Sequence, residues 1–323
     1  MHIPDGFLDT KTAVTTVVLA AAGVGIALRR VKREITPRTA PLMGLAAAFV
    51  FVAQMLNFPV AGGTSGHLMG SVLAVVLLGP SAGVIVLTSV LVVQSLLFAD
   101  GGILALGANV LNMAVVGSVG GYTVYSVVRR LITGDRGRLL AAAFAAWCST
   151  VLASIFCAGE LAWSGTVTWG LGFPAMANVH MVIGVGEALI TAMVIAAVGR
   201  MRPDLLRLQS GAPGNGGYVN LVAYGLVMTA GLLIFVVPFG SPWPDGLEKV
   251  AATLGFESRA ISPPVSSPLL DYQTPGIGSA AMATIMAGLI GSVIVFGLSW
   301  ILARSLTTGR AHDTSPEKQN GAD

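Results

Sequence analysis

Long apolar stretches constrain this chain more than any other feature. Stretches of about 20 residues recur along the 323-residue sequence, and a helix of that length spans the hydrocarbon core of a bilayer. Only 10% of the residues are charged, whereas a soluble domain carries about 25%. The chain therefore cannot cover a water-facing surface, and we predict an all-α, polytopic transmembrane helical bundle surrounded by membrane lipid.

The apolar stretches predict about nine spans. Their expected bounds are 12–29, 39–56, 66–79, 80–98, 108–128, 139–159, 177–199, 218–238 and 276–303. The third stretch is short and meets the fourth at Gly79-Pro80, which predicts a tight helical hairpin at that point.

Arginines and lysines gather in every second connection between these spans. The opposite loops hold only Lys249 and Arg259. The clusters are Arg29, Arg30, Lys32, Arg33 and Arg38; Arg129, Arg130, Arg136 and Arg138; Arg200, Arg202 and Arg207; and Arg304, Arg310 and Lys318. Nine spans that begin with an outside N-terminus place all clusters on one face, which the positive-inside rule makes cytoplasmic. We expect a bacterial plasma-membrane (inner-membrane) protein with a cytoplasmic C-terminus, and no nucleic-acid partner, because the basic residues form no single patch.

A Gly/Pro-rich stretch divides the chain into two modules. We expect a first membrane module at 1–202, a linker at 203–217, a two-span companion module at 218–304 and a disordered cytoplasmic tail at 305–323. Within the companion module, the loop 239–275 is long for a bare connection, which indicates a role of its own.

The first two residues and one loop histidine form a nitrogen-rich set. Residues 1–6 lack the positively charged region and cleavage site of a signal peptide, so we expect the mature chain to keep them. The α-amino group of Met1 and the amide and imidazole of His2 can close adjacent chelate rings on one ion, and nickel and copper favour such square-planar nitrogen sites. His67 lies in a glycine-rich loop on the same predicted face and is the candidate for the fourth nitrogen, although a lone loop histidine is usually not a ligand.

His180 and Glu187 are seven residues apart on the seventh predicted span, hence on one helix face. Glu187 is the only carboxylate well inside a predicted span, where an ionised acid costs about 2.5–3.5 kcal/mol. One interpretation is a His–Glu hydrogen-bond pair that holds the bundle together; the other is a role beside the ion or along its path. Asn57 and Asn109 likewise either join helices or support a site.

Several enzyme classes are excluded by missing motifs. The sequence has no G-x-x-x-x-G-K-[ST] loop for ATP, no H-E-x-x-H motif and no recognisable Ser/His/Asp set. We therefore expect a transport subunit that is not an enzyme. Two alternatives are a stand-alone divalent-metal channel or secondary carrier, which would transport without other subunits, and an intramembrane enzyme that uses His180 and Glu187.

Several motifs resemble those of one family of membrane proteins. They are Met1-His2-Ile3-Pro4-Asp5-Gly6-Phe7-Leu8, Gln54-Met55-Leu56-Asn57-Phe58-Pro59-Val60, Ser65-Gly66-His67-Leu68, Gly79-Pro80, Asp100-Gly101-Gly102 and Leu106-Gly107-Ala108-Asn109. Together they resemble the CbiM/NikM family, the substrate-specificity (S) components of energy-coupling factor (ECF) transporters, a class of ABC importers, for cobalt and nickel. Residues 218–303, with Pro244-Asp245-Gly246-Leu247-Glu248, resemble the CbiN/NikN companion subunit, or PDGLE domain.

The resemblance implies a ligand set and two kinds of partner. The ion would be held by the Met1 amine, the His2 amide and imidazole and the His67 imidazole. Ser65, in the same motif as His67, is a further candidate for a role around the ion or along its path. Ni²⁺ or Co²⁺ is then the transported ligand, with no permanent cofactor, and the fused companion favours nickel. The expected partners are a transmembrane coupling (T) component and cytoplasmic ATP-binding cassette ATPases, which supply the ATP hydrolysis. The chain departs from the family at Pro4-Asp5, where many relatives have Met-Glu.

Overall fold

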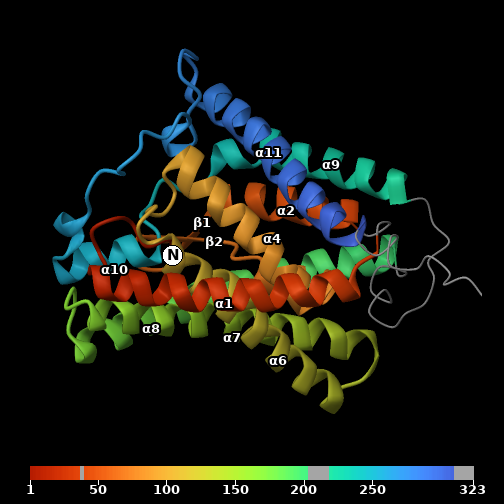
Figure 1. Cartoon of the computed structure of the whole chain (residues 1–323), viewed down its shortest axis with the longest axis horizontal. Coiled ribbons are helices and arrows are strands. Elements are labelled where there is room, and N and C mark those ends of the chain that lie inside the picture. Colours follow the sequence, from red (N-terminus) through yellow and green to blue (C-terminus); the bar gives the residue numbers. More distant parts are fainter. Residues whose placement is uncertain (37–39, 203–217, 309–323) are drawn as a thin grey trace, which may run out of the picture.

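The computed structural model describes residues 1–36, 40–202 and 218–308, and they are predominantly helical. The predicted linker lies outside the described residues, as does the predicted tail beyond Thr308. Figure 1 shows the arrangement. In the first module the elements are α1 (Thr10–Glu34), α2 (Ala40–Met55), β1 (Asn57–Val60), β2 (Thr64–His67), α3 (Ser71–Leu78), α4 (Pro80–Val93), the π-helical turn η1 (Gln94–Phe98), α5 (Leu106–Asn109), the π-helical turn η2 (Val110–Val116), α6 (Gly117–Leu131), α7 (Gly134–Trp163) and α8 (Trp169–Met201).

The companion module contains two long helices joined by a structured loop. Its elements are α9 (Tyr218–Phe235), the 3₁₀ turn η4 (Val237–Phe239), α10 (Gly246–Leu254), the 3₁₀ turns η5 (Glu257–Arg259) and η6 (Leu270–Tyr272), and α11 (Ala280–Thr308). Helices α9 and α11 both pack against α2, and α11 also contacts α4 (Figure 1). Because α11 ends at Thr308, the first four residues of the predicted tail, 305–308, still belong to a helix.

Seven helical segments of the described chain are long and apolar enough to cross a membrane. They are Thr10–Glu34, Pro80–Phe98, Leu106–Leu131, Gly134–Trp163, Trp169–Met201, Val219–Phe239 and Ala280–Thr307. Helix α2 is a shorter apolar helix of 16 residues. The protein is thus a multi-pass membrane protein, but the nine predicted spans are not confirmed.

The segment 66–79 is where the span prediction was wrong. It begins within strand β2, and the helix that follows, α3, has only eight residues. Eight residues rise about 12 Å, whereas the hydrocarbon core of a bilayer is about 30 Å thick. Most residues of α3 are buried inside the protein, so its apolar composition reflects burial among other helices rather than contact with lipid.

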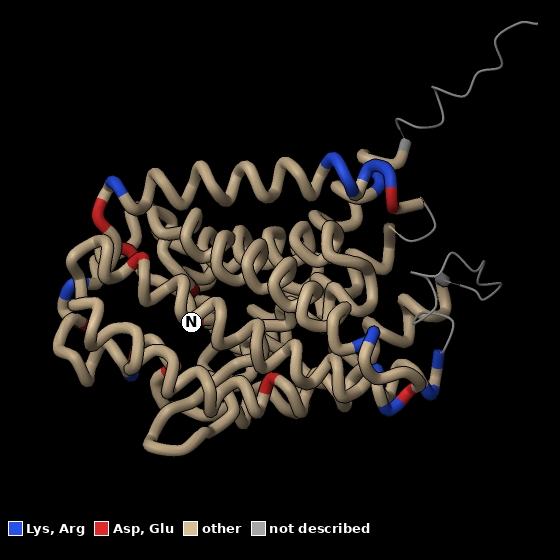
Figure 2. Tube along the Cα trace, turned by 90° about the horizontal axis from the view of Figure 1, so that it is seen from below, with Lys and Arg blue, Asp and Glu red and all other residues tan. Residues whose placement is uncertain are grey.

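Within the described residues, the basic residues of the predicted clusters gather at one end of the bundle. Figure 2 shows lysines and arginines concentrated at that end. Helices α1 and α6 have basic residues in their last turns, as does α8, at Arg200. The separation of charge expected from the loops is therefore present in the fold.

Candidate metal centre

Hydrogen bonds to its own backbone hold the N-terminal segment of the chain inside the bundle. The Asn109 side chain accepts a hydrogen bond from the Ile3 amide at 2.8 Å and donates one to the Ile3 carbonyl at 3.0 Å. The amide of Gly102 donates to the same carbonyl at 2.8 Å. Only glycine fits at 102, because a Cβ atom there would lie 2.4 Å from the Asp5 amide nitrogen. These contacts leave Met1 and His2 buried.

Asp5 fastens the same N-terminal segment to the loop that precedes α5. Its carboxylate accepts hydrogen bonds from the amides of Leu104 at 2.8 Å and Ile103 at 3.2 Å. Its own carbonyl accepts from the Ile261 amide at 2.9 Å, which lies in the companion loop. Both modules therefore hold the N-terminus in place.

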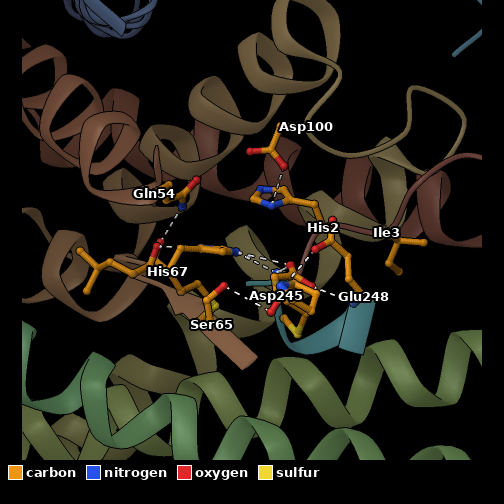
Figure 3. A network of polar contacts seen from close by, with 12 residues as sticks. His2, Ile3, Gln54, Ser65, His67, Asp100, Asp245 and Glu248 are labelled. Carbon is orange, nitrogen blue, oxygen red and sulfur yellow. Dashed lines mark hydrogen bonds and ion pairs between the residues drawn. The ribbon is translucent and has the colours of Figure 1, made fainter. Parts of the chain in front are cut away.

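A two-stranded hairpin brings His67 to the Met1 amine. Strands β1 and β2 pair antiparallel, with Asn57 opposite His67. His67 Nδ1 donates to the Leu68 carbonyl at 3.2 Å, so the lone pair of Nε2 is directed at the Met1 nitrogen 2.8 Å away. The imidazoles of His2 and His67 stack with their centroids 5.1 Å apart. Three of the predicted ligand groups therefore lie together (Figure 3).

Asp245 of the companion loop also reaches this centre. Its Oδ2 atom lies 2.6 Å from the Met1 nitrogen and 4.0 Å from His67 Nε2. A capping box at the start of α10 orients the side chain: Asp245 Oδ1 accepts from the Glu248 amide at 2.9 Å, and the Glu248 carboxylate accepts from the Asp245 amide at 2.8 Å. One carboxylate oxygen is thus committed to the helix and the other to the amine.

The segment before Asp245 is anchored on the hairpin. The Ser65 amide donates to the Pro244 carbonyl at 2.8 Å, and the Ser65 hydroxyl donates to the Trp243 carbonyl at 2.6 Å. The Asn57 carbonyl accepts from the Ser241 amide at 2.7 Å. The contacts found for Ser65 and Asn57 therefore position Asp245 and His67.

A second chain of hydrogen bonds connects His2 to the companion loop. His2 Nδ1 lies 3.1 Å from Asp100 Oδ1, and the Tyr272 hydroxyl donates to Asp100 Oδ2 at 2.5 Å. Tyr272 in turn accepts from Gln94 Nε2 at 3.1 Å. Burial, together with the Asp100 carboxylate, holds the pKa of Tyr272 well above its usual value, so the hydroxyl remains a donor.

Burial keeps the two imidazoles neutral. Desolvation, reinforced by the positive Met1 amine, lowers the pKa of His67 to about 3. Desolvation also lowers the pKa of His2, although the nearby Asp100 carboxylate opposes this shift. Burial alone would raise the pKa of Asp245, but the Met1 amine and His67 hold it below its usual value. The centre therefore contains two neutral imidazoles, the positive Met1 amine and the Asp245 carboxylate, with the Asp100 carboxylate beside His2.

His180 and Glu187 do not form the predicted pair. Seven residues rise about 10 Å along a helix, so two side chains of α8 at that spacing share a face but cannot meet. His180 Nδ1 donates to the Met176 carbonyl at 2.8 Å. The Glu187 carboxylate accepts from the amides of Met69 at 2.6 Å and Gly70 at 3.0 Å. A second buried carboxylate, Glu160, lies in the last turn of α7, beyond the end of the predicted span 139–159.

A small cavity of about 20 Å³ adjoins Met1. This volume holds roughly one water-sized particle. It is lined by Met1, Gly66, His67, Met69, Met113, Thr150, His180, Ile183, Asp245 and Gly246. The Nε2 atom of His180 is buried and has no hydrogen-bond partner among the described residues. His180 therefore lies beside the centre, whereas Glu187 supports the turn that follows His67.

Sequence reasoning missed the contributions of Asp245, Asp100 and Tyr272. Both aspartates lie in segments that carried the family resemblance, Asp100-Gly101-Gly102 and Pro244-Asp245-Gly246, but no spacing rule connects them to His2 or Met1. In the described part of the chain, His, Cys, Asp and Glu side chains alone form no metal-binding group of three. The centre depends on the backbone amine, which a search for side-chain clusters does not detect.

Comparison with known families identifies the first module. Residues 2–205 match the CbiM family model, described as a cobalt uptake substrate-specific transmembrane region. The chain belongs to the CbiM family. Residues 219–308 match the PDGLE domain. The chain is accordingly a membrane component of metal transport and not an enzyme.

Two relatives contain both the CbiM region and the companion. A protein from Archaeoglobus fulgidus, provisionally named a fused nickel transport protein NikMN, is 39% identical over 95% of this chain and 100% of its own length. The fused nickel transport protein NikMN of Rhodobacter capsulatus is 31% identical over 96% of this chain and 100% of its own.

The crystal structure of a truncated transition metal transporter resembles part of this chain. Its TM-score is 0.57 at 32% identity, and the alignment covers 62% of this chain and 99% of that one.

Proposed function

We propose that this chain is the substrate-binding S component of an ECF-type importer for Ni²⁺ or Co²⁺, with nickel preferred. The proposed ligands are the Met1 amine, the His2 amide and imidazole and the His67 imidazole. The observation that carries the proposal is the 2.8 Å separation between the Met1 nitrogen and His67 Nε2, in a buried centre with neutral imidazoles. Adjacent ligands in a square plane with bonds of about 2.0 Å are about 2.8 Å apart.

Binding in this plane requires one rearrangement. Only Nδ1 of His2 can close a chelate ring with the His2 amide, because Nε2 is too far along the ring. In the structure Nδ1 faces Asp100 instead. The imidazole must therefore leave Asp100 and turn toward the amine when the ion binds. Asn109 would hold the N-terminal segment during this change, since it exchanges two hydrogen bonds with the Ile3 backbone and none of them involves His2.

The proposed partners follow from the chemistry that this chain lacks. Its sequence has no ATP-binding motif, so ATP hydrolysis falls to cytoplasmic ATP-binding cassette subunits, coupled through a transmembrane T component. The basic end of the bundle would face the cytoplasm and the N-terminus the outside. The preference for nickel is supported by the two fused relatives, both named as nickel transport proteins.

Metal analysis of untagged protein tests the proposal directly. Protein purified from a medium with equal Ni²⁺ and Co²⁺ should contain one equivalent of metal, mostly nickel, and His67→Ala should contain none. A His67→Ala chain that retains the wild-type metal content would overturn the ligand assignment. Uptake into vesicles by this chain alone would instead support a stand-alone carrier.

A further inference from the structure

Three candidate ligand atoms already lie near three corners of a square. The Met1 nitrogen is 2.8 Å from His67 Nε2 and 2.6 Å from Asp245 Oδ2, and the last two atoms are 4.0 Å apart. A triangle with these sides has an angle of about 95° at the amine, which is close to the right angle of a square plane.

The centre of that square suits a divalent metal ion. A point midway between His67 Nε2 and Asp245 Oδ2 is about 2.0 Å from both atoms and about 1.8 Å from the amine. Bonds from divalent metals to imidazole nitrogen and carboxylate oxygen are about 2.0–2.2 Å long. In this arrangement the protons of the amine link the three atoms, and an ion that displaces these protons gains two nitrogens and one oxygen at once.

Asp245 Oδ2 occupies the corner of the square that the His2 amide nitrogen takes in the proposed plane of four nitrogens. In that plane the His2 amide is next to the Met1 amine and opposite His67. Asp245 Oδ2 is likewise next to the amine and opposite His67. The His2 ring cannot yet take part, because its Nδ1 contacts Asp100.

We propose that Asp245 is the capture ligand of the metal centre. The ion first binds the Met1 amine, His67 Nε2 and Asp245 Oδ2; the His2 amide nitrogen and Nδ1 then replace the carboxylate. The amine and the amide each release one proton to water. This inference rests on the proposed function and adds a ligand from the companion loop to it.

Charge balance favours this exchange. The carboxylate and the deprotonated amide each contribute one negative charge at the same corner, so the net charge of the ion and its ligands stays the same. A buried site that carried the full double charge of the ion would be far costlier. The capping box commits Oδ1 to the Glu248 amide and so holds Oδ2 in a fixed position for the ion.

The first test measures the rate of Ni²⁺ binding to the full chain in detergent by stopped flow. Asp245→Asn and Asp245→Ser remove the carboxylate but keep a residue that caps α10. Asp271→Asn is the matched control, since Asp271 is an exposed acid of the same loop. We expect both Asp245 variants to bind Ni²⁺ at least about tenfold more slowly, with Kd changed less than about threefold, and the control to match the wild type.

A second test needs no variant. Cu²⁺ also favours square-planar nitrogen sites, and freeze-quench EPR of the wild-type chain with Cu²⁺ should show an early species with two nitrogens and one oxygen. This species should convert to one with four nitrogens.

Three results would decide against the inference. If the Asp245 variants bind at the rate of Asp271→Asn, or if EPR shows four nitrogens from the earliest time, Asp245 is not a capture ligand. If Kd weakens in proportion to the rate, the carboxylate stays in the final complex and the exchange is wrong. Wild-type protein that binds neither Ni²⁺ nor Co²⁺ would instead overturn the proposed function itself.

Discussion

Replacing Glu187 tests how the bundle supports His67. The two oxygens of this carboxylate accept hydrogen bonds from the amides of Met69 and Gly70, which immediately precede α3. The amides around the first turn of a helix have no acceptor within the helix. A side chain of α8 therefore stabilises the turn between the His67 strand and α3, and the free energy of unfolding should depend on both hydrogen bonds.

The structure gives an order for two substitutions. Glu187→Ala leaves both amides buried without an acceptor, at about 1–3 kcal/mol each, hence about 2–6 kcal/mol in total. Glu187→Gln keeps one acceptor oxygen and turns an NH₂ group toward the other amide, so the loss is about 1–3 kcal/mol. An amide thus cannot replace this carboxylate without cost.

Glu160 provides the matched control. Its Oε2 accepts from Asn112 Nδ2 at 2.7 Å, whereas its Oε1 has no hydrogen-bond partner among the described residues. Glu160→Gln can keep the single hydrogen bond, and we expect a change below about 1 kcal/mol.

Thermal unfolding in one detergent measures all three variants. One kcal/mol shifts the Tm of a domain of 150–250 residues by about 2–4 °C. The expected order of Tm is Glu187→Ala below Glu187→Gln, with Glu160→Gln close to the wild type. If Glu187→Gln melts together with Glu160→Gln, the two hydrogen bonds to Met69 and Gly70 do not support the turn.

Four further outcomes are expected. His2→Ala and His67→Ala should each abolish high-affinity Ni²⁺ binding in calorimetry while the Tm stays within a few degrees. Burial lowers the pKa of His67 to about 3 and also lowers that of His2. The protons of the amine and the amide, which the ion must displace, then dominate the pH dependence from pH 8 to 6. Affinity should fall at least about tenfold per pH unit over this range, whereas a flat affinity would contradict nitrogen ligation. One extra residue before Met1 should abolish metal binding, because it removes the amine from the centre, and a C-terminal extension should not. Deletion of residues 210–323 should leave equilibrium Ni²⁺ binding largely intact but stop cellular uptake; loss of binding by the folded remainder would show that the companion supplies a permanent ligand.

Seven of the nine predicted spans correspond to long apolar helices of the described chain, and these could be predicted because lipid imposes a length. Helices such as α1 and α11 follow their apolar stretches closely, since every backbone group inside a bilayer needs an internal partner. The segment 66–79 was predicted to be a span because a helix buried in protein is as apolar as one that faces lipid. Only the length of α3, eight residues, shows that it is a buried helix. The hairpin 57–67 was not foreseen, because its strands carry little alternation of apolar and polar residues.

The candidate site was predictable only where local chemistry carried it. The Met1 amine and His2 are adjacent in sequence, and His67 followed from its glycine-rich loop on the same predicted face and from the resemblance. Asp245 lies 244 positions from Met1 and reaches it through the capping box and the contacts of Ser65 with residues 243 and 244. No spacing in the sequence encodes this contact, so the acids of the companion loop form no pattern that predicts a metal ligand.

The two-module architecture limits what Asp245 can do. All four nitrogens of the proposed plane belong to the first module, and the alignment with a solved transition metal transporter covers 99% of that chain but only 62% of this one. Because none of these four nitrogens comes from the companion module, the proposed final complex does not need residue 245. Asp245 nevertheless contacts the amine directly at 2.6 Å. Both facts agree if the carboxylate changes how fast the ion reaches the nitrogens and not how tightly they finally hold it.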